Sequence, residues 1–179
     1  MAILHIPDEN RHLTDQGEIK SFLAERGVWF DQWEASAELA PEADQETVLA
    51  AYEHVLAPYM ATNGYQTADV ISVHPGIPNK EAVKTKFLTE HTHSEDEVRF
   101  FVDGEGLFWF NMENDNPVFC VVCQKGDLIS VPANTKHWFD FGPKFSVKAI
   151  RIFIYQSGWV PHYTESGVDH EYNQLGLSA

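Results

Sequence analysis

Three histidines and one glutamate stand at spacings typical of a transition-metal site. His91 and His93 are two residues apart in the stretch HTHSEDE, so on a strand both side chains project from the same side. Glu97 follows after a polar run that indicates a tight turn, and His137 lies further along, in GDLISVPANTKHWF. Three imidazoles and one carboxylate suit iron, nickel, copper, manganese or zinc better than calcium or magnesium, which prefer oxygen ligands. We therefore predict that these four residues bind one divalent transition-metal ion.

Each of these residues also has a simpler interpretation. A single histidine is often an ordinary core or surface residue, and an acidic run such as 95–97 is often a solvated turn. The combined spacing favours the metal site, because Gly104 follows Glu97 at seven residues and a second block runs from Gly126 through Pro132 to His137.

Three further charged residues are candidates for an active-site role. Arg99 is two residues beyond Glu97 and shares its face on an uninterrupted strand. Arg151 stands in the apolar run AIRIFIY, where an unpaired charge would be costly. Glu90, next to His91, could orient a ligand imidazole. For the arginines the alternative is an ion pair with a buried carboxylate such as Glu97 or Glu90, and for Glu90 it is a solvent-facing position.

Charge and composition exclude several classes of protein. The 179 residues carry 27 acids against 12 bases, a net charge of −15, which disfavours nucleic acid and anionic membranes as partners. No apolar run is long enough to span a membrane, and the N-terminus lacks the basic and apolar regions of a secretory signal. We expect a cytoplasmic protein as the default. We also expect a monomer, because no coiled-coil heptad or long exposed apolar helix face is evident.

The two cysteines, Cys120 and Cys123, have C-x-x-C spacing, which can indicate a redox pair or half of a zinc site. They fall in VFCVVCQ, a strand-like run, where residues three apart point to opposite faces. We predict buried structural thiols.

The chain is expected to form a single domain over residues 1–179, with an elaboration at 1–84, a motif-bearing barrel core at 85–156 and a C-terminal segment at 157–179. The first part shows a strand near 2–6, a helix after Asp15 with Glu18 as a capping box, a strand at 28–33, a helix at 45–60 that Pro58 should kink or end, a strand at 69–74 and a short helix at 79–86. From residue 85 onward short β-rich runs alternate with turns, including one at 104–106. This pattern predicts a mainly β protein, an antiparallel barrel or jelly roll with the helices packed outside.

The metal-binding stretches resemble the two cupin motifs. HTHSEDEVRFFVDG resembles the first motif through His91, His93, Glu97 and Gly104, and GDLISVPANTKH resembles the second through Gly126, Pro132 and His137. Two positions depart from the pattern, because Thr85 and Asn134 stand where glycine is expected. Neither is a ligand, so the departures concern loop geometry.

The resemblance is closer to the acireductone dioxygenase family, through KFLTEHTHSEDEVRFFVDGEGLFWF, GDLISVPANTKHWFD, AIRIF, VWFDQW and ETVLAAYEHVL. It implies cleavage of 1,2-dihydroxy-3-keto-5-(methylthio)pentene by O2 in methionine salvage. With Fe2+ the implied products are 4-methylthio-2-oxobutanoate and formate, and with Ni2+ they are 3-methylthiopropanoate, formate and carbon monoxide. The resemblance also places Phe87, Phe139 and Trp159 in the pocket for the methylthio group.

Two alternatives remain open on the sequence. One is another metal-dependent cupin enzyme, such as a diketone- or ring-cleaving dioxygenase or a sugar isomerase. The other is a non-catalytic, ligand-binding cupin, which the presence of all four ligands disfavours.

Overall fold

The computed structural model describes residues 1–112, 116–155 and 160–177. Within them lie eleven strands and four α-helices. The strands are β1 (Ile3–Ile6), β2 (Arg11–Leu13), β3 (Trp29–Gln32), β4 (Thr67–Val73), β5 (His91–Thr92), β6 (Glu97–Phe110), β7 (Phe119–Gln124), β8 (Asp127–Val131), β9 (His137–Asp140), β10 (Val147–Phe153) and β11 (His162–Tyr163). The helices are α1 (Gln16–Ala24), α2 (Gln45–Asn63), α3 (Lys80–Leu88) and α4 (Val168–Tyr172).

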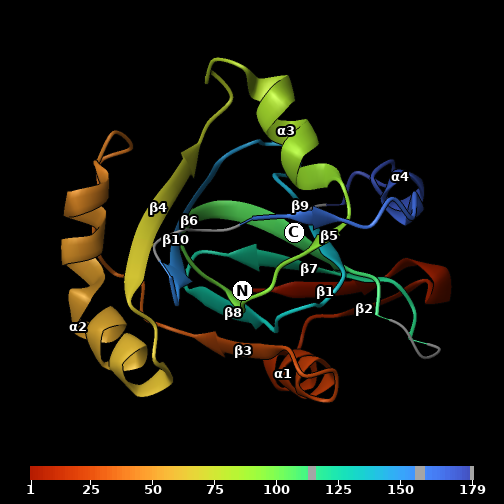
Figure 1. Cartoon of the computed structure of the whole chain (residues 1–179), viewed down its shortest axis with the longest axis horizontal. Coiled ribbons are helices and arrows are strands. Elements are labelled where there is room, and N and C mark those ends of the chain that lie inside the picture. The colour runs from red at the N-terminus through yellow and green to blue at the C-terminus, as the bar shows by residue number, and fades with distance from the viewer. Residues whose placement is uncertain (113–115, 156–159, 178–179) are drawn as a thin grey trace.

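The strands form two antiparallel sheets that share β6. One sheet has the order β11-β5-β9-β6-β7-β1-β2. In the other sheet β6 pairs with β8 on one side and with β10 on the other, and β8 pairs with β3 while β10 pairs with β4. The helices lie around the outside, with α2 beside β4 and α4 on the opposite side of the molecule (Figure 1). The predicted mainly β, antiparallel architecture with helices packed outside is confirmed. Strands from the first 84 residues are built into the sheets, because β1 pairs with β7, β3 with β8 and β4 with β10.

The strand β6 connects the two sheets without a turn. The sequence predicts a turn at 104–106, and this prediction is wrong. Gly104 instead takes a φ of +74°, and a Cβ at this position would overlap the carbonyl oxygen of Ser146, the residue just before the neighbouring strand β10. The pairing of β6 with β10 shifts register beside it, between Lys148 and Ala149. The glycine therefore lets one long strand bend from one sheet into the other.

Two helices begin where the sequence predicts. The carboxylate of Asp15 accepts a hydrogen bond from the backbone N–H of Glu18 at 2.9 Å, and Asp44 caps α2 in the same way. The expectation that Pro58 ends α2 early is wrong, since the helix continues to Asn63 and stops at Gly64, which has a φ of 78°. A glycine in the left-handed conformation is the stronger stop signal here.

The main hydrophobic core lies between the two sheets and is rich in phenylalanine. It is formed by side chains from the strands of both sheets, together with α1 and Phe87 of α3. Cys123 points into this core, whereas Cys120 packs on the other side of β7 among Trp109, Trp138 and residues of α4. Both cysteines are buried and reduced, as predicted. None of the helices in the described part of the chain has the length and apolar character that crossing a membrane requires.

Candidate metal centre

The four predicted ligands converge inside the barrel. His91 lies on β5, Glu97 begins β6 and His137 begins β9, while His93 stands in the short link from β5 to β6. His91 and His137 face each other across β5 and β9. All four side chains are buried, and one ligand atom from each lies within 4.8 Å of the others. The sequence prediction that these residues come together is confirmed, and the group has the composition and size of a site for one transition-metal ion.

Backbone carbonyl oxygens fix the orientation of all three imidazoles. The Nδ1 atom of His91 lies 2.7 Å from the carbonyl oxygen of Thr89, and that of His137 lies 2.8 Å from the carbonyl oxygen of Thr135. A carbonyl can only accept, so each Nδ1 carries the proton and each Nε2 keeps a lone pair. His93 is held in the same way, with Nδ1 at 3.0 Å from the carbonyl oxygen of a distant residue, Val160. Neutral imidazoles with an available Nε2 are the form that binds a metal ion.

Glu97 divides its two carboxylate oxygens between an arginine and the histidines. Oε1 lies 2.6 Å from Nη2 of Arg99, and Oε2 lies 2.8 Å from Nε2 of His137 and 3.1 Å from Nε2 of His93. Burial alone would raise the pKa of the Glu97 carboxyl, but the neighbouring Arg99 guanidinium holds it well below its usual range. Because the Nδ1 protons are donated to carbonyl oxygens, the Nε2 lone pairs of His93 and His137 both face Oε2 of Glu97. A cation between these three atoms would satisfy all of them. The donor set therefore fits a metal ion.

The histidine on β5 is held neutral. Burial, assisted by the neighbouring His137, lowers the pKa of His91 to about 3. At neutral pH no proton has to leave this imidazole before it can bind a metal.

Arg99 is fully buried in an aromatic cage. Its guanidinium carbon lies 4.3 Å from the ring centre of Phe139, 5.0 Å from that of Phe108 and 5.7 Å from that of Phe87. Sequence reasoning missed Phe108, although it is two residues from Phe110 on β6 and so shares its core-facing side. The pair of Arg99 with Glu97 is the ion pair expected as the alternative to a substrate role. Within the described part of the chain, however, Nε and Nη1 of Arg99 have no hydrogen-bond partner.

Two more predicted residues lie near the metal group, and one is outside the described residues. Phe87 and Phe139 pack against each other with ring centres 6.4 Å apart, on the side of Arg99. Trp159 falls in the stretch 156–159, outside the described residues.

Arg151 lies directly across from Arg99 on β10 and makes a bidentate ion pair with Asp69 on β4, at 2.6 and 2.7 Å. The structure thus gives Arg151 a carboxylate partner, although not one of the two that the sequence suggested.

Glu90 contacts a different set of groups than expected. The sequence suggested that its carboxylate could orient a ligand imidazole, but its partners are the side chains of Asn111, Thr164 and Ser166. Its alternative, a solvent-facing position, is also wrong, since Glu90 is 1% exposed. The carbonyl oxygens supplied by the backbone make a carboxylate unnecessary for the imidazoles.

The loop before His137 is hydrogen-bonded to the link between β5 and β6, which carries His93. The backbone N–H of Asn134 donates to the carbonyl oxygen of His93, and that of Ala133 donates to the carboxylate of Asp96. Asn134 has a φ of +62°, the left-handed conformation that asparagine tolerates better than most residues. It therefore substitutes for the glycine that the second cupin motif has at this position.

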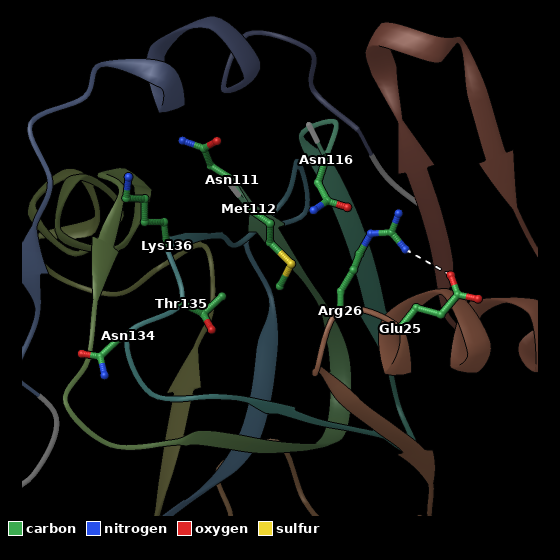
Figure 2. Close-up of a pocket in the computed structure, with 8 residues that line it drawn as sticks. All are labelled: Glu25, Arg26, Asn111, Met112, Asn116, Asn134, Thr135 and Lys136. Carbon is green, nitrogen blue, oxygen red and sulfur yellow. Dashed lines mark ion pairs between the residues drawn. The ribbon is translucent and has the colours of Figure 1, made fainter. Parts of the chain in front are cut away.

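A separate polar cavity of about 600 Å³ lies behind this loop. Figure 2 shows Arg26 and Glu25 on one side of it and the segment from Asn134 to Lys136 on the other. Its lining residues are Glu25, Arg26, Asn111, Met112, Asn116, Asn134, Thr135 and Lys136, and none of them belongs to the metal group.

The comparison with known protein families decides the relationship. The model of the ARD/ARD' family matches residues 5–161. The chain belongs to the ARD/ARD' family. The family resemblance read from the metal-binding stretches is thus confirmed.

Relatives in this family match nearly the whole chain. A protein of Picosynechococcus sp. named acireductone dioxygenase is 56% identical over 177 residues, covering 99% of this chain and 100% of the relative. The acireductone dioxygenase of Alcanivorax borkumensis is 47% identical and covers 92% of this chain and 90% of its own. Among solved structures, the acireductone dioxygenase of Bacillus anthracis with a cadmium ion in its active centre superposes with a TM-score of 0.84 at 36% identity, covering 91% of this chain and 98% of that one.

Proposed function

We propose that this protein is an acireductone dioxygenase that uses O2 to cleave 1,2-dihydroxy-3-keto-5-(methylthio)pentene in methionine salvage. The observation that carries the proposal is the convergence of His91, His93, Glu97 and His137 in a chain of the ARD/ARD' family. The cadmium ion in the active centre of the Bacillus anthracis relative supports a metal site at the same place in the fold.

We propose Fe2+ or Ni2+, one ion per chain, as the natural metal. The three Nε2 atoms and Oε2 of Glu97 would hold it. A divalent ion supplies Lewis acidity and a template for two oxygens of a chelating enediol. With iron the expected products are 4-methylthio-2-oxobutanoate and formate, and with nickel they are 3-methylthiopropanoate, formate and carbon monoxide.

Arg99 is the proposed partner for the anionic substrate. The guanidinium of Arg99 is fully buried, and its Nε and Nη1 have no hydrogen-bond partner among the described residues. It can therefore donate hydrogen bonds to a substrate oxyanion at little further desolvation cost. Glu97 already compensates part of its charge and fixes its position. Phe87 and Phe139 beside it offer an apolar surface that excludes water from the methylthio end of the substrate.

Arg151 is also proposed to contribute positive charge to the substrate. It lies opposite Arg99 on the adjacent strand, and Asp69 holds its guanidinium in one orientation. Its side chain is partly exposed, so its contribution should be weaker than that of Arg99.

The proposal is tested by product analysis with defined metals. Metal-free protein is reloaded in parallel with Fe2+ and Ni2+, given anaerobically generated acireductone and then air, and compared with a metal-free blank. Formate with the keto acid from the iron form, and carbon monoxide from the nickel form, are the expected results. If both loaded samples match the blank while one ion is bound per chain, the substrate assignment is wrong. His137→Ala serves as the matched control and should lose both metal and activity.

A further inference from the structure

We propose that Glu90 is a positioning residue for the metal ligand His93, and that it acts through the C-terminal segment of residues 160–166, here called the C-terminal strap. The proposal concerns metal retention, and it rests on the metal-binding part of the proposed function but not on the substrate.

The C-terminal strap touches two of the three ligand imidazoles. The carbonyl oxygen of Val160 accepts the Nδ1 proton of His93 at 3.0 Å. The ring of Tyr163 packs edge-on against that of His91, with ring centres 6.0 Å apart. The strap therefore forms one wall of the metal centre, although none of its residues is a ligand.

Little apolar surface holds the strap in place. Its β-pairing covers two residues of β11 against two of β5, and Val160 and Tyr163 are exposed. A short, exposed two-stranded pairing contributes little stability by itself. Among the described residues, the attachment of the strap therefore comes mainly from polar contacts, which include a hydrogen bond from the Tyr163 hydroxyl to the carbonyl oxygen of Lys86 at 3.3 Å.

Glu90 supplies the principal polar attachment. Its Oε1 accepts hydrogen bonds from the hydroxyl groups of Thr164 and Ser166, the latter at 2.7 Å, and its carbonyl oxygen accepts from the backbone N–H of Thr164. Its Oε2 accepts from the side-chain amide of Asn111 at 2.7 Å. Asn111 follows β6 and is fixed to the barrel through its backbone bond to Lys136, so it holds the carboxylate from the side opposite the strap.

These contacts link Glu90 to His93 in one continuous path. Hydrogen bonds to a buried carboxylate are stronger than bonds between neutral groups. Losing the bonds from Thr164 and Ser166 to Glu90 should therefore detach the strap at these two residues. When the strap moves, the carbonyl oxygen of Val160 leaves Nδ1 of His93, and this imidazole loses the contact that selects its tautomer. His137 takes its orientation from Thr135 in a different loop, so we expect its imidazole to keep its tautomer when the strap moves.

The test uses a matched pair at position 164. Thr164→Val keeps the shape of the side chain but removes the hydroxyl, whereas Thr164→Ser keeps the hydroxyl. In Ni2+-loaded protein, transfer of the metal to excess EDTA should be about tenfold faster in Thr164→Val and in Glu90→Gln, since losing a contact that orients a ligand weakens metal affinity by about 10- to 100-fold. Thr164→Ser should release the metal at the wild-type rate.

A second readout examines the histidines directly. In metal-free protein with 15N-labelled histidine, the ring nitrogen shifts of His93 should show the Nδ1–H tautomer in the wild type and in Thr164→Ser, and a mixture of tautomers in Thr164→Val. The shifts of His137 should stay constant in all three. This readout still decides the proposal if the wild type proves to bind no metal, a result that would refute the proposed function instead.

Two outcomes would overturn the proposal. One is that Thr164→Val releases the metal at the wild-type rate and keeps the wild-type tautomer of His93. The other is an equal disturbance of His93 and His137, which would indicate general loosening of the barrel. Tyr172→Phe, which removes the hydrogen bond from α4 to Asp8 without touching the strap, controls for effects of the C-terminus as a whole.

Discussion

Replacing Arg99 with methionine should destabilise the metal-free protein strongly. Methionine fills nearly the same space between the aromatic rings but leaves the carboxylate of Glu97 without its cation. Arg99 is fully buried and Glu97 is 4% exposed, so water cannot replace the lost partner. Removing one member of a buried ion pair costs about 3–5 kcal/mol, and we expect a loss of unfolding free energy in this range.

The matched control is Arg151→Met, on the facing position of the neighbouring strand. Its partner Asp69 is 36% exposed, so solvent screens the pair and the loss should be about 0–1 kcal/mol. Both variants remove one arginine from the same region of the sheet, and both leave one carboxylate without its cation. Because the exposed pair is bidentate and the buried pair is a single contact, a larger loss for Arg99→Met would reflect burial and not the number of hydrogen bonds.

Metal binding should reverse part of the loss. Bound Zn2+ would compensate the charge of Glu97 in the variant, whereas in the wild type Arg99 already compensates it through the other carboxylate oxygen. The metal should therefore raise the unfolding free energy of Arg99→Met by more than it raises that of the wild type, since a ligand stabilises the state it binds. Urea unfolding of both proteins with and without Zn2+ measures these quantities. A loss below about 1 kcal/mol without metal, or equal losses for both arginine variants, would refute the reasoning.

Three further predictions concern the surrounding barrel. Gly106→Ala should lower the unfolding free energy by about 1–3 kcal/mol in urea unfolding, because the added Cβ would overlap the ring of Phe139; an unchanged value would show that the ring can move freely. Lys148→Met should speed proteolysis of the loop before α2, since its buried ammonium donates to two carbonyl oxygens of that loop, and cleavage at the wild-type rate would contradict this role. Cys120 and Cys123 should resist alkylation by iodoacetamide until the protein unfolds, because burial raises the pKa of both thiols; labelling of the native protein in mass spectrometry would argue against it.

Local signals in the sequence were sufficient for three of the ligands, His91, His93 and Glu97, and for several elements. His91 and His93 could be placed together because strand geometry alternates side chains, and Asp15 marked a helix start because its carboxylate satisfies a backbone N–H of the first turn. Each of these inferences depends on residues within a few positions of one another.

The contacts that failed to show in the sequence are long-range. The carbonyl oxygen of Val160 that orients His93 is 67 residues away along the chain, and every residue has such a carbonyl, so no side-chain pattern can reveal it. The role of Glu90 depends on Thr164 and Ser166, which approach only after β11 pairs with β5. At Gly104 the sequence predicts a turn, because glycine is common in turns as well as in bent strands. The neighbouring strand β10, which decides between the two, comes later in the chain.

The orientation of the imidazoles by main-chain carbonyls has a consequence for mutational tolerance. The side chains at Thr89, Thr135 and Val160 can change without removing the oxygen that fixes each ring, so substitutions there should be accepted as long as the backbone keeps its path. Glu97 differs, because a side chain, that of Arg99, holds its second oxygen. In a mutational scan around the metal, sensitivity to substitution should therefore be concentrated at the ligands, Arg99 and Glu90, with far less at Thr89, Thr135 and Val160, which orient the histidines through their carbonyl oxygens alone.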